Sequence, residues 1–254
     1  MKIKKHDNYL WYVLNGMSEE ESGEMARALK FESTNKLKEE FDYDADTHAL
    51  EAAIRYYGSD WLWHGAFGKD WATYEEILKG VARFQKVNYP DDTSVEELEH
   101  CIMVSIVNKA WKKMNNEERR KYEDEIIELE NEMSKQTPDE LKELLEKLKV
   151  TTLKGLTPGT LLSAGLDFKM GAFISYEILV IVMRTFAKAF GIKIAVKNAA
   201  LYTFLTVPVL NIFMGVWLAW DVRKLICGPS MSKIIPAVFL ISTSRIKQRC
   251  KEVR

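Results

Sequence analysis

Glycine, proline and cysteine are scarce in this sequence. Thirteen glycines and six prolines among 254 residues are too few for the many turns of an all-β fold. The three cysteines, Cys101, Cys227 and Cys250, are odd in number and widely spaced, which argues against a disulfide framework and favours a reducing compartment. The four histidines do not combine with them in a zinc-binding pattern, so we expect neither a metal nor a cofactor.

A secretory signal is also lacking. Residues 1–7 are basic, but no apolar run follows them as a signal peptide requires. We therefore expect a cytoplasmic protein, with association at the inner membrane as the alternative that the apolar C-terminal half raises.

Acidic residues are scarce only in the second half of the chain. Residues 1–150 hold 22 basic and 33 acidic residues, a balance of −11, whereas residues 151–254 hold 14 basic and 4 acidic residues, a balance of +10. The two halves should attract each other in the folded protein, and the second half alone should be drawn to an anionic surface. We divide the chain accordingly into an acidic amphipathic helical domain, 1–150, and a basic apolar helical domain, 151–254.

Helix start signals recur along the N-terminal half. Capping boxes, in which a serine or threonine precedes a glutamate by three residues, begin at Ser18, Thr73, Ser94 and Thr137. Pro138 suits the first position of a helix, and Asn116 is expected to cap a charged helix that precedes it. These two helices are expected to form a helical hairpin over residues 117–149. Another helix, from about Asp44, is expected to end at Gly58. These signals predict an all-α, multi-helix bundle.

Charges become sparse between residues 171 and 220. Residues 171–190 carry Glu177, Arg184 and Lys188 on one narrow stripe of a helix. Residues 198–220 form an uncharged run of 23 residues, 17 of them apolar. As a helix this run would be about 35 Å long, enough to cross a bilayer core of about 30 Å. The candidate membrane-inserting residues of this apolar helical hairpin are Asn198, Leu201, Phe204, Pro208, Leu210, Asn211, Phe213, Trp217 and Trp220.

Three interpretations of residues 171–220 stay open. A helix that is apolar on all sides suits the buried centre of a bundle, so the segment can be a permanent core. It can also be a permanent membrane segment that crosses once or twice. The third interpretation is a hairpin hidden in a soluble bundle and released into a membrane. That is the architecture of colicin-type pore formers, which the chain resembles in pattern alone.

The segment from Tyr56 to Trp71 is unusually rich in tryptophan and glycine. One interpretation is a binding loop, whose candidate residues are Asp60, Trp61, Trp63, His64, Lys69 and Asp70. The favoured alternative is a connection between helices whose aromatic side chains fill the bundle. No nucleophile and base occur here at a convincing spacing, so we predict that the protein is not an enzyme. Catalysis by Asp60, His64 and Asp70 is the least favoured alternative.

The C-terminal tail is basic, and residues 245–249 read Arg-Ile-Lys-Gln-Arg. Such a tail can bind nucleic acid or lipid headgroups, but it is more often simply solvated. Membrane lipid or another protein is the expected partner, and nucleic acid is not favoured.

A set of short motifs follows one another in an order that a known family shares. They are YYGSD at 56–60, the glycines at 65 and 68, YEEILKGV at 74–81, WKKM at 111–114, NEE at 116–118, GP at 228–229, IIPAV at 234–238 and Arg245. In this order they resemble the YaaW family of bacterial proteins, some of which carry a ubiquinol–cytochrome c chaperone-like description. The resemblance supplies no catalytic residues, and the chaperone description implies help in assembling a membrane-bound respiratory complex.

The favoured function is that of a non-enzymatic helical protein that acts at or near a membrane. Residues 171–220 would act there by conditional insertion or pore formation. The alternative is a soluble chaperone-like or protein-binding module in which residues 171–220 are a permanent buried core.

Overall fold

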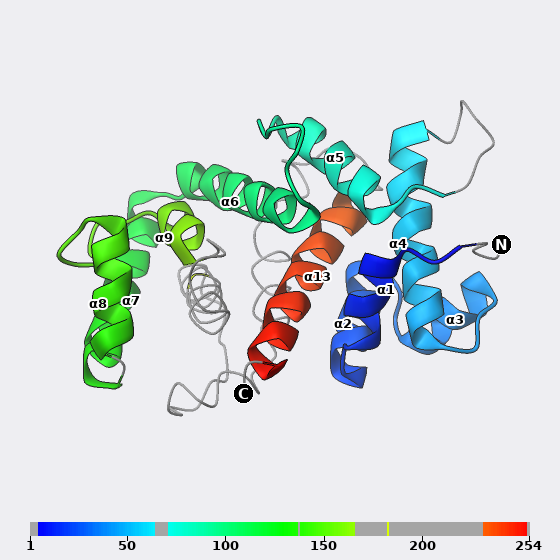
Figure 1. The fold of residues 1–254 in the computed structure, drawn as a ribbon, viewed down its shortest axis with the longest axis horizontal. Coiled ribbons are helices and arrows are strands. Elements are labelled where there is room, and N and C mark those ends of the chain that lie inside the picture. The colour runs from blue at the N-terminus through cyan, green and yellow to red at the C-terminus, as the bar shows by residue number, and fades with distance from the viewer. Residues whose placement is uncertain (1–4, 64–70, 137, 166–181, 183–230, 253–254) are drawn as a thin grey trace. The chain divides into compact units, whose positions relative to one another are not determined.

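The computed structural model describes residues 5–63, 71–136, 138–165, 182 and 231–252 (Figure 1). Every regular element in these ranges is an α-helix, which confirms the predicted all-α, multi-helix fold. The helices are α1 (Asn8–Asn15), α2 (Glu19–Ala28), α3 (Thr34–Phe41), α4 (Asp46–Trp63), α5 (Tyr74–Gln85), α6 (Val95–Lys113), α7 (Asn116–Gln136), α8 (Pro138–Leu148), α9 (Pro158–Gly165) and α13 (Met231–Glu252).

The chain divides into two compact units, each with contributions from distant parts of the sequence. Unit 1 comprises Met1–Met103 and Asp221–Gln248, and unit 2 comprises Val104–Trp220 and Arg249–Arg254. Unit 1 therefore combines the N-terminal helices with most of α13, although the two are separated by more than a hundred residues of sequence.

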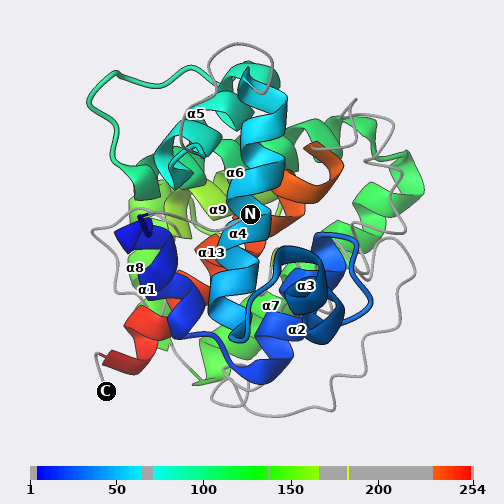
Figure 2. The same cartoon turned by 90° about the vertical axis from the view of Figure 1, so that its right-hand side faces the viewer.

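Helix α4 is the centre of unit 1. Figure 2 shows α1, α2, α3 and α5 arranged around it, and each of them packs against it. The buried face of α4 is built largely from small side chains, because Ala49, Ala52 and Ala53 are fully buried beside Leu50 and Ile54. Alanine favours the helix and lets neighbouring helices approach closely.

The capping boxes decide where three of the helices begin. Ser18 before α2 and Thr73 before α5 each accept the amide of the glutamate three residues on, while that glutamate accepts the cap's own amide. Ser94 and Glu97 make the same two bonds before α6, at 3.2 and 2.9 Å. These predictions are confirmed, whereas Thr137 lies outside the described residues.

The start of α7 differs by one residue from the expected one. Asn115, rather than Asn116, is the cap: its Oδ1 accepts the Glu118 amide at 2.9 Å, and Glu118 Oε2 accepts the Asn115 amide at 2.8 Å. The reason is that Asn115 has a glutamate three residues further on, whereas position 119 is an arginine, which cannot return the bond.

The prediction that a helix ends at Gly58 is wrong, because α4 continues through this residue to Trp63. The glycine is needed for close packing with α5 instead. A Cβ atom at position 58 would lie 2.5 Å from Ile77 Cδ1 and 2.6 Å from Ile77 Cγ1. The absence of a side chain therefore lets α5 approach α4 at this point.

Gly58→Ala should accordingly lower the free energy of unfolding by about 1–3 kcal/mol, the usual cost of overpacking a core. Gly23→Ala is the matched control. Gly23 also lies inside a helix, but its added Cβ would meet no atom within 4 Å. That variant should raise stability by roughly 0.5–1 kcal/mol, since alanine suits a helix better than glycine.

Urea unfolding followed by circular dichroism measures both variants. Repeating Gly58→Ala in an Ile77→Ala background should reduce its cost, because the atoms it meets are gone. If Gly58→Ala and Gly23→Ala change the free energy of unfolding equally, close packing of α5 on α4 does not require a glycine at position 58.

Helix α13 contributes the apolar block 234–241 to the core of unit 1. Its large apolar side chains are at most 2% exposed, and they are Ile234, Ile235, Val238, Phe239, Leu240 and Ile241. Each such side chain stabilises the fold by about 1.5–3 kcal/mol when fully buried. Pro236 lies inside this helix, where it has no amide to donate to the carbonyl four residues earlier.

Unit 2 contains the predicted helical hairpin, formed by α7 and α8, which pack on each other. Tyr122, Ile126 and Met133 of α7 are buried, as are Leu141 and Leu144 of α8. Helix α9 packs on α8. Among the helices in the described ranges, none combines the length and the apolar character that a bilayer crossing requires.

Candidate functional site

Most residues of the two predicted sites lie outside the part of the chain that the structure describes. The candidate membrane-inserting residues Asn198, Leu201, Phe204, Pro208, Leu210, Asn211, Phe213, Trp217 and Trp220 all do. So do His64, Lys69 and Asp70 of the predicted binding loop. Asp60, Trp61 and Trp63 lie on the last turn of α4, and their side chains are not described. Both sites therefore stay predictions.

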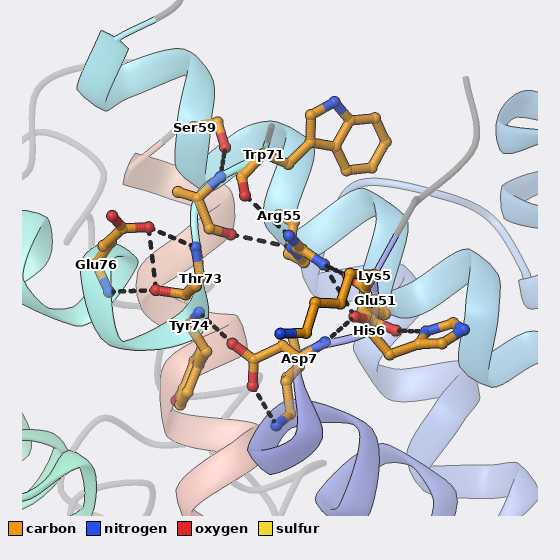
Figure 3. A network of polar contacts seen from close by, with 12 residues as sticks. Lys5, His6, Asp7, Glu51, Arg55, Ser59, Trp71, Thr73, Tyr74 and Glu76 are labelled. Carbon is orange, nitrogen blue, oxygen red and sulfur yellow. Dashed lines mark hydrogen bonds and ion pairs between the residues drawn. The ribbon is translucent and has the colours of Figure 1, made fainter. Parts of the chain in front are cut away.

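Arg55 of α4 binds the chain directly after the predicted loop (Figure 3). Its Nε donates to the Ala72 carbonyl at 3.0 Å, and its Nη2 donates to the Trp71 carbonyl at 2.8 Å. The Ala72 amide donates in turn to Ser59 Oγ at 2.7 Å. The backbone at 71–72 is thus fixed on α4, the same helix from which the chain enters residues 64–70.

The same part of α4 also binds the N-terminal segment. Glu51 Oε1 accepts the Asp7 amide at 2.8 Å, and Glu51 Oε2 lies 2.6 Å from His6 Nδ1. Arg55 Nη1 donates to the Lys5 carbonyl at 2.7 Å and to Glu51 Oε1 at 3.2 Å. Glu51 is fully buried and Arg55 is 6% exposed, so each needs the other's charge and these hydrogen bonds.

Asp7 connects this region to the start of two helices. Its Oδ1 accepts the Leu10 amide at 3.0 Å and caps α1. Its Oδ2 accepts the Tyr74 amide at 2.8 Å, at the first residue of α5. One carboxylate therefore satisfies free amides of both helices, and Figure 3 shows it between them.

Tyr74 carries the network on to α6 and α13. Its hydroxyl donates to Glu99 Oε1 at 2.8 Å, and Arg245 Nε and Nη2 donate to Glu99 Oε2 at 3.1 and 2.8 Å. Arg245 Nη1 also lies 3.9 Å from Glu96 Oε1. Tyr74 and Glu99 are fully buried, and Arg245 is 5% exposed. This is a second buried glutamate–arginine pair, and its partners are 146 residues apart in sequence.

Burial shifts the pKa of Glu99 and of Tyr74 in this triad, whereas neighbouring charges decide that of Arg245. It raises the pKa of the Glu99 carboxyl, although the Arg245 guanidinium and the Tyr74 hydroxyl favour its charged form. It also raises the pKa of Tyr74 well above its ordinary value, and the charge of Glu99 adds to this effect. Burial alone would lower the pKa of Arg245, but the neighbouring Glu99 carboxylate outweighs it and the pKa is raised. Tyr74 and Arg245 therefore keep their protons and act as donors to Glu99.

A further ion pair holds the C-terminal part of α13. Lys247 Nζ donates to Glu21 Oε1 at 2.9 Å, and Ser244 Oγ lies 3.4 Å from the same oxygen. The other oxygen of Glu21 accepts the Ser18 amide at 2.8 Å in the capping box of α2. Burial would raise the pKa of Glu21, but these bonds and the Lys247 charge outweigh it and the pKa is lowered.

At its other end α13 contacts an aromatic cluster. Lys233 Nζ lies 3.4 Å from the centroid of the Tyr57 ring and 5.9 Å from that of Phe31. A cation over the face of an aromatic ring is attracted by its quadrupole. Burial lowers the pKa of Lys233, which the charge of Glu40 opposes.

Residues 245–248 of the basic C-terminal segment are therefore not simply solvated, which corrects the expectation from sequence for this part of it. Arg245 and Lys247 pair with glutamates of the acidic half, and Gln248 Nε2 donates to the Val13 carbonyl at 2.8 Å. The reason is that residues 242–248 continue the helix whose apolar block is buried in unit 1, so their side chains are carried against α1, α2 and α6. In these pairs the glutamates come from residues 1–150 and the basic residues from 151–254, while the predicted attraction between the two halves as a whole stays a prediction.

One of the two buried glutamate–arginine pairs has a recognisable pattern in the sequence. Glu51 and Arg55 stand at i and i+4 within an otherwise apolar stretch, and an opposite-charge pair in such a setting is typical of a buried ion pair. Glu99 follows the apolar residue Leu98 in α6, which is a weaker signal. Nothing near Arg245 indicates its partner.

The chemistry of this network is structural. The buried glutamates accept bonds from arginine, lysine, tyrosine and backbone amides, which leaves them poorly suited to act as general bases. Within the described ranges, no group of three or more histidine, cysteine, aspartate or glutamate side chains is placed to hold a metal ion. What the arrangement does is to fix the N-terminal segment, the chain after the predicted loop and α13 on α4, α5 and α6.

Fold and network together define an all-α protein built around buried ion pairs. The chain is 30% identical over 212 residues to a UPF0174 protein of Helicobacter pylori, a match that covers 81% of this chain and 73% of that protein. The chain therefore belongs to the UPF0174 family. No family model matches the sequence, and no solved structure matches it. The resemblance to the YaaW family stays a prediction.

Proposed function

We propose that this protein is non-enzymatic and acts at or near a membrane through residues 171–220, by conditional insertion or pore formation. The observation that carries the proposal is the uncharged run of 23 residues at 198–220 within a half of the chain whose balance is +10. The interior of a protein and the interior of a bilayer are similarly apolar, so smaller free-energy contributions decide which of the two a segment such as 198–220 occupies. One such contribution is attraction of basic residues to anionic headgroups, about 1 kcal/mol for each residue near the surface.

The contacts of α13 support the proposal that residues 171–220 act at the membrane while the other helices remain folded. Three glutamates of the acidic half, Glu21, Glu96 and Glu99, lie opposite two basic residues of α13. Helix α13, which follows the apolar segment in sequence, is thus held by the helices of unit 1. Such a unit would present residues 171–220 to a membrane while it remained folded.

A second candidate function has an observation of its own. Val182, the one described residue between 171 and 220, is fully buried. This favours a permanent core in that part of the chain, and with it a soluble chaperone-like or protein-binding module. The chaperone-like description within the resembling YaaW family points in the same direction.

Vesicle binding and leakage distinguish the two candidates. Purified full-length protein is mixed with dye-loaded vesicles of phosphatidylglycerol and phosphatidylethanolamine at neutral and acidic pH. We expect the wild type to bind and release dye, and Leu210→Arg to lose both, because an arginine at the centre of a membrane helix costs about 2.5–3.5 kcal/mol on insertion scales.

Ile127→Arg is the matched control for the added charge. Ile127 is a 36% exposed apolar residue on α7, so the same substitution there should change neither folding nor vesicle binding. Circular dichroism must show that both variants are folded. A wild-type protein that neither binds nor permeabilises the vesicles at either pH would exclude the membrane function and leave the protein-binding module.

A further inference from the structure

The apolar segment lies between two parts of the chain that belong to the same compact unit. The chain leaves unit 1 within α6, after Met103, and returns to it at Asp221. Residues 171–220 fall inside this interval. The interval that contains them, Val104–Trp220, therefore begins and ends at unit 1.

The returning helix is held in that body along most of its length. Ile234 to Ile241 are at most 2% exposed, and the polar residues 242–245 that follow are at most 7% exposed. Arg245 contacts Glu99 of α6, and Lys247 contacts Glu21 of α2. Lys233 lies over the Tyr57 ring of α4. The helix α13 thus has an apolar, an ionic and a cation–π attachment to unit 1.

A single crossing of a membrane would break these attachments. It would place α13 on the opposite side from α6, so Glu99 would stay behind in a buried position without Arg245. The five basic residues of α13, Lys233, Arg245, Lys247, Arg249 and Lys251, would also have to pass through lipid. Charged side chains cross a bilayer core with difficulty, and clustered basic residues hold a segment on its original side.

We propose that α6 and α13 remain together on one side of any membrane that the protein engages, so that residues 171–220 enter and leave the bilayer from the same face. This inference rests on the proposed membrane function. The interval is long enough for two crossings, since each needs about 20 residues, and it is equally compatible with a hairpin lying in the interface. A single-pass arrangement is the alternative that it excludes.

Thiol labelling tests the sidedness. Cys101, Cys227 and Cys250 of the full-length protein are replaced by serine, and one cysteine is introduced by Glu97→Cys on α6 or by Arg249→Cys on α13. Each protein is bound to vesicles of phosphatidylglycerol and phosphatidylethanolamine. A maleimide coupled to a large polyethylene glycol, which cannot cross the bilayer or a small pore, is then added outside.

We expect both cysteines to be labelled to the same extent on vesicles as in detergent. Loss of labelling at one of the two positions, restored by detergent, would show opposite sides and overturn the inference. Protein that does not sediment with the vesicles refutes the proposed function instead, and it leaves the attachment of α13 to be decided separately.

Hydrogen exchange of the wild-type protein in solution decides that point. The amides of residues 238–245 should exchange as slowly as those of residues 50–55 in α4, because α13 opens only when unit 1 unfolds as a whole. Faster exchange of α13 than of α4 would mean that the helix detaches by itself. That result would overturn the inference whether or not vesicles are bound.

Discussion

Arg245→Ala is expected to lower the free energy of unfolding by about 3–5 kcal/mol, the usual result of removing one partner of a buried ion pair. The substitution leaves Glu99 fully buried, with the Tyr74 hydroxyl as a remaining donor but without a compensating charge. It also removes the bond between α13 and α6 that the two donors of Arg245 provide. The midpoint of urea unfolding, followed by circular dichroism, measures the effect.

Two further variants distinguish the loss of the pair from the loss of packing. Tyr74→Phe, Glu99→Leu and Arg245→Met together replace the polar triad with apolar side chains of similar size, and this triple variant should recover most of the lost stability. Lys36→Ala removes one partner of an exposed pair with Glu39 and should leave the urea midpoint essentially unchanged. If the triple variant is as unstable as Arg245→Ala, the cost comes from packing around position 245 and not from the stranded carboxylate.

Arg55→Ala should be destabilising to a similar degree, about 3–5 kcal/mol, for a related reason. It leaves Glu51 buried without its charge partner and removes donors from the carbonyls of Lys5, Trp71 and Ala72. The N-terminal segment and the chain after the predicted loop should therefore loosen together. Hydrogen exchange should show faster exchange at Asp7 and Ala72, whose amides bond to Glu51 and Ser59.

Arg55→Lys is the matched control. A lysine restores the positive charge beside Glu51 but cannot reproduce the fork of guanidinium donors, so its effect should lie between those of the wild type and the alanine variant. A lysine variant as stable as the wild type would mean that the charge alone matters and that the three carbonyl bonds contribute little. Exchange at Asp7 that increased without any change at Ala72 would show that the two segments are held independently.

Local chemistry explains why much of the helical pattern was predictable. The capping boxes at Ser18, Thr73 and Ser94 bond residues three positions apart, so the sequence contains both partners of each bond. Pro138 at the start of α8 was predictable for another local reason, because its fixed φ suits the first position of a helix.

The candidate sites stay predictions. The composition of residues 171–220 supports a membrane or core segment, yet composition cannot choose between them, because both surroundings satisfy apolar side chains equally. The tryptophan-rich segment could be singled out, but its anchor Arg55 could not be assigned a role, because its bonds go to backbone carbonyls up to 50 residues away.

The sequence by itself determined that the protein is all-α, where several helices begin, and that its two halves carry opposite charge. Only the tertiary structure decided that Gly58 serves the approach of α5 rather than the end of α4, because the atom it makes room for belongs to Ile77. It also decided that residues 245–248 of the basic C-terminal segment continue α13, and that Lys247 and Arg245 pair with Glu21 and Glu99. Those partners lie 226 and 146 residues away in sequence, and a pattern of neighbouring residues contains no information about which distant carboxylate a given arginine or lysine will reach.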